Sequence, residues 1–138
     1  MPDTRPKPLP AVDALSKPFW DAAQQHRLVL QRCTACGYFN HPPRLACDAC
    51  QSQQLDFEPV SGRGRIYSFT VMHQPNIVGF EDEIPYLNIL VELEEQAKLF
   101  MVCDLPLADR DTVKIGGLVE VWFEDVNAEI SLPRFRLA

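Results

Sequence analysis

Large apolar residues alternate with polar ones over most of the chain beyond residue 61, which predicts β-strands. The clearest case runs from Tyr86 to Glu94, where every second residue is a large aliphatic. The same pattern predicts four further strands, at residues 65–73, 98–105, 118–125 and 132–137. Short connections leave no room for parallel crossovers, so we expect an antiparallel sheet. A five-stranded OB-type barrel fits best, because closing the sheet removes its exposed edges.

The alternation also predicts which side chains face the interior of this barrel. Glu120 and Glu124 occupy the polar phase of the strand 118–125 and should point to solvent. The interior should then include the apolar residues of the opposite phase, Val119, Val121, Phe123 and Leu137.

The N-terminal part of the chain has no such alternation. Residues 1–12 contain four of the twelve prolines, so we expect residues 1–15 to form a flexible lead. Ser16 followed by Lys17 and Pro18 is typical of a helix start, with Ser16 as the cap and the helix running to about Gln25.

Four cysteines follow this helix as two C-x-x-C pairs, framed by predicted strands at residues 28–33 and 55–60. Each pair can point two thiolates at one ion, and two facing pairs supply four ligands at tetrahedral corners. Gly37, directly after the first pair, suits the tight turn that such a pair requires. The spacing predicts a metal site formed by Cys33, Cys36, Cys47 and Cys50.

A closed shell of four thiolates has no open position for substrate, which favours a structural zinc ion over a reactive site. Iron in a rubredoxin-like centre is the rival, because ligand softness and geometry alone do not exclude it. A thioredoxin-type redox dithiol is disfavoured, because it needs only one C-x-x-C pair and because the sequence shows no βαβ context. Roughly thirty residues around the cysteines cannot bury a sufficient core, so the metal should replace it. We therefore expect residues 16–60 to form a helix plus a zinc ribbon, and residues 61–138 to form the barrel.

The net charge of −6 comes entirely from residues 61–138, which hold seven basic and thirteen acidic side chains. A nucleic-acid-binding protein usually has a basic surface, so nucleic acid is not an expected partner. No apolar run approaches the twenty or so residues that span a bilayer, so no membrane association is expected. The N-terminus lacks the layout of a signal peptide, which predicts a cytoplasmic protein.

Other candidate chemistry is sparse. Cys103 lies in an apolar strand and is expected to be buried and inert. His26 and His41 flank the ribbon and are expected at the surface or in packing, while His73 ends a strand. The acidic cluster 81–83 is most simply a solvated loop, with a docking patch as the alternative. No nucleophile elbow, Walker loop or dinucleotide motif is present, so the residues alone do not indicate an enzyme.

The order of these parts resembles the DUF35 family. The segments that carry the resemblance are LVLQRCTACG, PPRLACDAC, SGRGRIYSFTVMHQP and IPYLNILVELEE, and it extends from about Phe19 to the end. The resemblance implies a mainly β protein with an N-terminal helix and a rubredoxin-like zinc ribbon, followed by a five-stranded antiparallel OB-fold barrel. It also implies a role in acyl-CoA metabolism.

The function implied by the resemblance is that of a non-catalytic accessory subunit, without turnover alone. Its partner would be a thiolase-superfamily enzyme (a thiolase, aldolase or acyltransferase), in a hetero-oligomer. Phe19 and Trp20 are candidates for the interface, unless they pack against the ribbon. Two alternatives stay open: a nucleic-acid-binding zinc-ribbon and OB-fold protein, and an iron electron carrier.

The resemblance further implies that coenzyme A or acyl-CoA is a ligand. Arg63 and Arg65 flank Gly64, and two guanidinium groups beside a glycine suit phosphate oxygens. The alternative is that the glycines only permit a turn while both arginines pair with acids of the barrel. Tyr67 and Phe69 share one face of the strand 65–73 if it is regular, either as a stacking wall for the coenzyme or as core.

Overall fold

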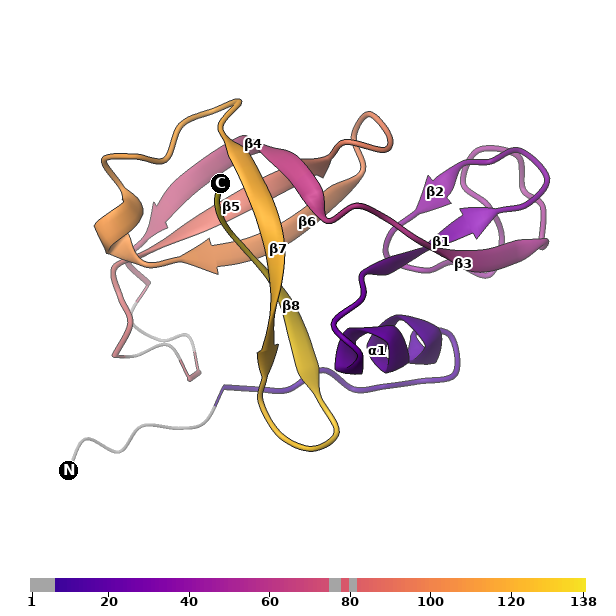
Figure 1. The fold of residues 1–138 in the computed structure, drawn as a ribbon, viewed down its shortest axis with the longest axis horizontal. Helices are drawn as coiled ribbons and strands as arrows, with labels where there is room; N and C mark the ends of the chain where they lie inside the picture. Colours follow the sequence, from indigo (N-terminus) through magenta and orange to yellow (C-terminus); the bar gives the residue numbers. More distant parts are fainter. Residues whose placement is uncertain (1–6, 75–77, 80–81) are drawn as a thin grey trace.

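The computed structural model describes residues 7–74, 78–79 and 82–138, which form two antiparallel sheets lying side by side (Figure 1). The smaller sheet has the strand order β2-β1-β3 and the larger one β6-β5-β4-β7-β8. The elements are α1 (Lys17–Gln24), β1 (Val29–Cys33), β2 (Phe39–Asn40), β3 (Leu55–Pro59), β4 (Arg63–Met72), β5 (Tyr86–Leu93), β6 (Phe100–Leu105), the 3-10 turn η1 (Leu107–Asp109), β7 (Leu118–Asp125) and β8 (Ser131–Leu137).

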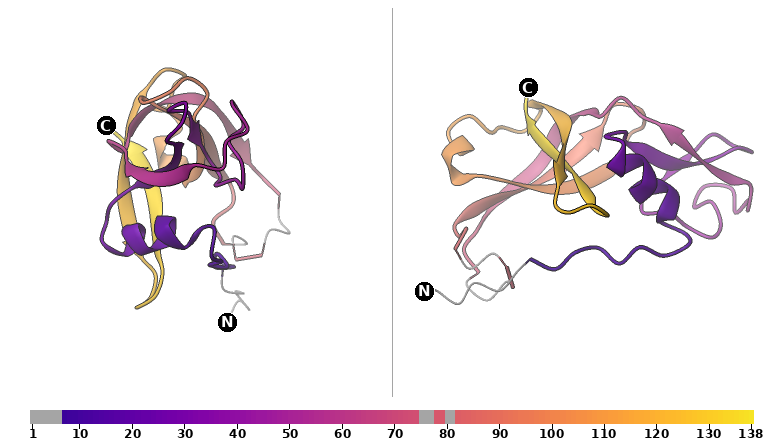
Figure 2. Two further views of the ribbon diagram at one scale, coloured as in Figure 1. Left: turned by 90° about the vertical axis from the view of Figure 1, so that its right-hand side faces the viewer. Right: turned by 60° about the horizontal axis from the view of Figure 1, so that its bottom comes forward.

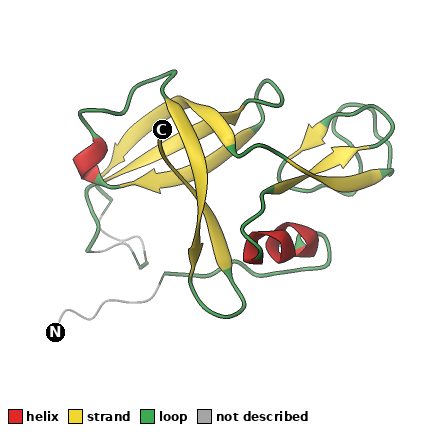
Figure 3. Cartoon of the chain, in the orientation of Figure 1, coloured by secondary structure: helices red, strands yellow, loops and turns green. Residues whose placement is uncertain are grey.

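Strands and loops dominate the chain, and α1 is the one α-helix among the described residues (Figure 3). The mainly β fold is therefore confirmed, and each predicted strand begins and ends within two residues of its expected position. The two-residue strand β2 was not predicted. No helix in the described part of the chain is long and apolar enough to cross a bilayer.

The start of α1 differs from the prediction that Ser16 caps it. The Ser16 hydroxyl makes no capping bond to the helix and instead accepts the backbone N–H of Asp13 at 3.2 Å. In return the Asp13 carboxylate accepts the N–H of Ser16 at 2.7 Å. This reciprocal pair has the arrangement of a capping box, so the chain begins to turn at Asp13, three residues earlier than expected.

β1 is the central strand of the smaller sheet. It pairs with β3 over its whole length, from Val29 opposite Pro59 to Cys33 opposite Leu55, but with β2 over only two residues. This sheet therefore places the first cysteine at the end of a strand that is held from both sides.

The larger sheet curls into a barrel whose edges meet without a regular ladder (Figures 1 and 2). The edge strands β6 and β8 are joined by side chains instead. The backbone N–H of Phe135 donates to Cys103 Sγ at 3.3 Å, and Arg134 pairs with Asp104 at 2.7 Å. The barrel is thus partly open, as OB-folds are.

The pairing of β4 changes along its length. It pairs with β5 from Gly64 to Met72, but with β7 only at residues 63–65. A β-bulge interrupts the register at Tyr67, which has no partner residue on β5. A bulge shifts the alternation of the residues that follow, so the two halves of β4 present opposite phases to the interior.

One hydrophobic cluster extends through both sheets. It contains Phe19, Leu30 and Phe39 from the N-terminal part together with buried residues of the barrel such as Ile66 and Phe135. The barrel and ribbon therefore share a core. The boundaries of the lead (1–15), the ribbon (16–60) and the barrel (61–138) stay predictions.

The predicted register of β7 is confirmed. Val119 is buried, and the other three predicted interior residues are half-buried and pack against the cluster. Glu120 and Glu124 point outward, where they pair with Arg136 at 2.9 Å and Arg134 at 3.2 Å.

Residues 7–12 of the lead form neither helix nor strand and run past the barrel to α1 (Figure 2). Lys7 pairs with Glu83 at 2.8 Å. Residue 81 of the predicted acidic cluster lies outside the described residues. Asp82 and Glu83 are exposed, as expected of a solvated loop, and Glu83 also pairs with the lead.

Candidate metal centre

The two C-x-x-C turns face each other at one end of the smaller sheet. The sulfur atoms of all four cysteines lie within 4.8 Å of one another. Cys33 Sγ lies 3.6 Å from Cys50 Sγ, and Cys36 Sγ lies 3.7 Å from Cys47 Sγ. A zinc–sulfur bond of about 2.3 Å gives a tetrahedral edge of roughly 3.8 Å, so the sulfur atoms are spaced for one metal ion.

The first turn is held by backbone hydrogen bonds. The N–H of Cys33 donates to the Tyr38 carbonyl at 2.9 Å, and the N–H of Gly37 donates to the Cys33 carbonyl at 2.8 Å. Gly37 has φ +81°, a conformation in which L side chains are strained, as its position after the cysteine pair predicted.

The second turn repeats this pattern without a glycine. Cys47 donates to the Ser52 carbonyl at 2.8 Å, and Gln51 donates to the Cys47 carbonyl at 2.9 Å. Gln51 takes the place of Gly37 with φ +68°. The second turn is thus strained at Gln51, and in this conformation it presents its sulfur atoms in the same way as the first turn.

Backbone amides also stabilise the thiolates. The Cys36 amide lies 3.4 Å from Cys33 Sγ, and this contact lowers the pKa of Cys33. Burial opposes ionisation of Cys47, but the amides of Cys50 and Ala49 outweigh it and lower the pKa of Cys47 to about 6.

The Cys36 thiol shows why a cation is required. The Tyr38 amide favours the thiolate of Cys36, but burial and the neighbouring sulfur atoms outweigh it and raise the pKa of Cys36 to about 12. Four thiolates this close cannot all ionise unless a positive charge lies between them. The residues therefore fit a tetrahedrally bound metal ion.

Buried side-chain amides support the loop between the two turns, and the sequence analysis missed them. Gln31 donates to the Arg44 carbonyl and accepts the Arg44 N–H, both at 2.8 Å. Asn40 is 1% exposed and accepts the Asp48 N–H at 3.0 Å. Its Nδ2 has no partner in hydrogen-bonding geometry among the described residues, but the Asn40 side chain still favours the thiolate of Cys47 and helps to lower the pKa of Cys47. An amide donor beside a metal-bound sulfur is the kind of support that tunes such sites.

A third amide links the ribbon to the barrel. Gln96, in the β5–β6 turn, accepts the Phe39 N–H at 2.8 Å and donates to the Phe39 carbonyl at 3.0 Å. The Gln96 side chain thus pairs with β2 as a neighbouring strand would.

The structure brings together only some of the residues predicted to bind coenzyme A. Arg63, Gly64 and Arg65 line a hollow of about 480 Å³. Its other lining residues include three acids and the C-terminal residue: Glu92, Glu94, Glu120 and Ala138. Arg63 pairs with Glu94 at 3.1 Å. Among the described residues, Arg65 has no such partner.

Gly64 has a structural reason to be glycine. A Cβ there would lie 2.5 Å from the carbonyl oxygen of Glu92 on the neighbouring strand. A Cβ at Gly62 would lie 2.3 Å from Val121 Cγ1. Both glycines therefore serve close packing between strands, a role that the sequence did not predict.

Tyr67 and Phe69 do not share a face, because the bulge separates them. The Tyr67 ring lies 4.8 Å from the Phe100 ring, on the outer side of the sheet with Arg65. Phe69 pairs with the buried Ile89 and so faces the inner side. The prediction that Tyr67 and Phe69 share one face as a stacking wall is therefore wrong.

A cavity of about 710 Å³ lies between the lead, α1, the ribbon loop at residues 41–43 and the β6–β8 seam, and it was not predicted. Its walls are mostly apolar and include Phe19, Trp20, Met101 and Leu132. Phe19 is buried, with its ring 4.8 Å from that of Trp20, so Phe19 serves packing and not an interface.

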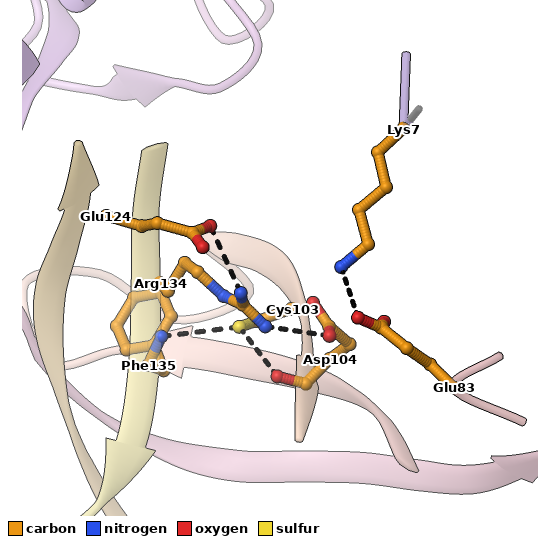
Figure 4. A network of polar contacts seen from close by, with 7 residues as sticks. All are labelled: Lys7, Glu83, Cys103, Asp104, Glu124, Arg134 and Phe135. Carbon is orange, nitrogen blue, oxygen red and sulfur yellow. Dashed lines mark hydrogen bonds and ion pairs between the residues drawn. The ribbon is translucent and has the colours of Figure 1, made fainter. Parts of the chain in front are cut away.

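Figure 4 shows the polar contacts at this seam, where Arg134 lies between Asp104 and Glu124. Cys103 is buried behind them, and burial raises the pKa of its thiol. Its S–H donates to the Asp104 carbonyl at 3.2 Å. Cys103 is therefore a structural cysteine, as predicted.

The histidines also serve packing or the surface. The His41 ring lies 5.6 Å from Phe19, and burial lowers the pKa of His41. The His26 ring stacks on Phe123 at 5.3 Å and bonds Asp125 at 2.8 Å, which fixes the end of α1 to β7.

Comparison with known proteins gives two matching family models. The "ChsH2, rubredoxin-like zinc ribbon domain" matches residues 20–56, and the "ChsH2, C-terminal OB-fold domain" matches residues 57–124. The four cysteines thus lie within a zinc-ribbon domain by sequence as well as by geometry.

Two curated relatives and one solved structure are similar over most of the chain. A "probable enoyl-CoA hydratase alpha subunit" of Thermomonospora curvata is 38% identical over 96% of this chain, which spans 40% of that relative's length. A "DUF35 domain-containing scaffold protein" of Methanothermobacter thermautotrophicus is 35% identical, over 77% of this chain and 78% of the relative. A solved structure, "Ltp2-ChsH2(DUF35) aldolase", has a TM-score of 0.79 and 36% identity, covering 94% of this chain and 98% of that one.

Proposed function

Because the chain belongs to the DUF35 family, with ribbon and OB-fold domains of the ChsH2 type, we propose that it is a non-catalytic accessory subunit of a thiolase-superfamily enzyme. The observation that carries this proposal is the closed set of four sulfur atoms within 4.8 Å. Four ligands leave a metal ion no position for substrate. The remaining cysteine, Cys103, is buried with a raised pKa.

The names of the relatives support an accessory role. One is called a scaffold protein, one a hydratase alpha subunit, and the similar solved structure is called an aldolase with a DUF35 component. These names and the closed four-cysteine site both agree with a scaffold role beside an acyl-CoA enzyme.

The metal in this proposal is zinc, held by Cys33, Cys36, Cys47 and Cys50. It would supply folding energy rather than chemistry, because Cys47 is the one buried residue between positions 41 and 60. Iron is the competing metal, since it accepts the same four-sulfur geometry. Metal analysis and visible absorbance of the purified protein distinguish the two: a zinc protein is colourless, and an iron centre would indicate an electron carrier.

The experiment that tests the function is purification of the tagged chain from its native host, followed by reconstitution with any thiolase-superfamily subunit that mass spectrometry identifies. We expect a stable hetero-oligomer, and an enzyme that loses most of its acyl-CoA turnover when this chain is omitted. An enzyme that is fully active alone would contradict the accessory role.

We also propose that Arg65 is the main contact with the coenzyme, assisted by Arg63. Support comes from the Arg65 guanidinium, which has no acidic partner among the described residues, and from the aromatic side chain of Tyr67 on the same outer face. A phosphate could bind the guanidinium while an adenine stacks on the ring. The acids around Arg63 oppose this binding, so the contact should be modest in strength.

The test for the coenzyme compares Arg65→Ala with Arg136→Ala in the reconstituted enzyme. Arg136 is an exposed arginine of the same barrel, already paired with Glu120, and serves as the matched control. We expect the Michaelis constant for acyl-CoA to rise about tenfold for Arg65→Ala, from a charge-assisted bond of about 1.5 kcal/mol, and to stay unchanged for Arg136→Ala. Equal Michaelis constants for acyl-CoA in both variants would show that Arg65 does not bind the coenzyme. The accessory role would stand.

A further inference from the structure

The far half of β4 is a free sheet edge. β7 pairs with β4 only at residues 63–65, and the last backbone bonds on that side join Ile66 to Gly116 at 2.8 Å and Gly117 at 2.9 Å. From residue 67 to residue 72, β4 pairs with β5 alone among the described residues. About half of the main-chain N–H and C=O groups in this stretch therefore point away from the sheet.

This edge lacks most of the features that protect free strands. Residues 67–72 read YSFTVM and contain no charge and no proline, and the bulge at Tyr67 lies at the start of the stretch rather than within it. Phe69 and Val71 pair with the fully buried Ile89 and Leu87, yet they stay 37% and 36% exposed. They are exposed because no strand continues the sheet beside them.

Exposed apolar residues continue beyond the strand itself. Ile115 is 70% exposed and Leu118 is 57% exposed, and both lie next to the point where β7 leaves β4. A partner that covers this edge would therefore gain main-chain hydrogen bonds and apolar contact together.

Charge decides between a second copy and a different protein. Residues 61–138 hold seven basic and thirteen acidic side chains, so two barrels that met edge to edge would each carry a net charge of −6. Like charges of this size disfavour self-association. A partner with neutral or basic surroundings has no such penalty.

We infer that residues 67–72 of β4 are a docking edge, to which an extended segment of the enzyme subunit adds as a further strand. The segment is uncharged, with apolar side chains at the positions that meet Phe69 and Val71, and its neighbours rest on Ile115 and Leu118. This inference rests on the proposed function, because it takes the enzyme subunit as the partner.

The closing experiment measures amide hydrogen exchange of the full metal-loaded chain, alone and in complex with the purified enzyme subunit. We expect the outward-facing amides of residues 67–72 to exchange at least tenfold more slowly in the complex. Exchange of Val102, which is 67% exposed on the outer face of β6, should not change. A complex with unchanged exchange at residues 67–72 overturns the docking edge but keeps the accessory role, whereas the absence of any complex overturns both.

Two variants give an independent measurement. Val71→Lys places a charge on the edge, and Val102→Lys places the same charge at a more exposed position on a strand away from it. We expect the dissociation constant to rise at least tenfold for Val71→Lys and less than twofold for Val102→Lys, with both variants unfolding near the wild-type temperature. Equal effects of the two variants overturn the inference. It is also overturned if the isolated chain has the mass of a dimer and the amides of residues 67–72 already exchange slowly in it. If Val71→Lys does not fold, the exchange measurement on the wild-type chain decides.

Discussion

The ribbon and the barrel share one core, but they are held together by different forces. Buried positions of the ribbon include the polar Gln31 and Asn40 and two cysteines, all of which act through directional bonds. The buried positions of β5 are the aliphatics Leu87, Ile89, Val91 and Leu93, together with Tyr86 at its start. The ribbon therefore depends on a few specific contacts, whereas the barrel depends on the total apolar area that it buries.

This difference predicts that the two regions fail in different ways. Loss of one ligand should remove the ribbon's structure as a unit, because the thiolates then repel one another without a cation. Loss of one apolar side chain should weaken the barrel in proportion to the volume removed.

The largest effect is expected from Cys47→Ser or from a strong chelator. Structural zinc contributes about 10–16 kcal/mol in small zinc domains, so the ribbon should unfold while the barrel retains strand structure. The measurement combines metal content with amide exchange in each region. Cys103→Ser is the control and should keep the metal, because Cys103 is not among the four clustered sulfur atoms. A Cys47→Ser protein with an intact ribbon would show that the metal is dispensable.

Phe135→Ala should have the next largest effect. Phe135 is 2% exposed in the centre of the barrel core, and removal of a buried phenylalanine costs about 3–5 kcal/mol. Denaturant unfolding should show this loss while the metal content of the folded protein is unchanged. If the metal is lost first, the two regions are not held independently.

Asn40→Ala should destabilise the ribbon by about 1–3 kcal/mol, because it leaves the Asp48 N–H without its acceptor. We expect the chelator concentration that removes the metal to fall, with no change in barrel exchange. Asn127→Ala provides a comparison, since Asn127 supports the β7–β8 turn through the Glu129 and Ile130 amides instead. Equal metal retention in both variants would show that Asn40 does not support the metal site.

The smallest effect concerns pH. Burial lowers the pKa of His41 below 6.5, so the unfolded chain binds a proton more readily than the folded one. Stability should therefore fall as pH drops below about 6.5, by at most about 1.4 kcal/mol per pH unit, and His41→Gln should remove this part of the dependence. His73→Gln is the control variant, because His73 is exposed at a strand end. Thermal unfolding between pH 5 and pH 8 measures all three proteins.

The sequence predicted the fold well where one physical signal dominates. Period-two alternation located β5 and β7, and the cysteine spacing located the metal site, since each depends on the identity of residues close together in the chain. Gly37 was recognised for the same reason, whereas Gln51 was not, because a glutamine with positive φ carries no sequence signal.

Features that depend on distant residues could not be predicted in this way. Gln96 bonds the backbone of Phe39, 57 positions away, and nothing in either segment marks the contact. Ser16 occupies the cap position of α1 as predicted, but its side chain bonds the backbone of Asp13 and not a helix amide, and only the geometry shows this exchange. The bulge was missed because YSF continues a regular alternation by composition.

The bulge at Tyr67 also fixes the length of the chain at this point. Deleting one residue there would exchange the faces of every later position in β4, moving Ser68 and Thr70 inward and Phe69 and Val71 outward. A gain or loss of a single residue is therefore not a neutral event at this site, unlike most substitutions on the same strand. When relatives are aligned, a gap placed between Ile66 and Phe69 would indicate either an error of alignment or a barrel in which the other side chains of β4 face inward.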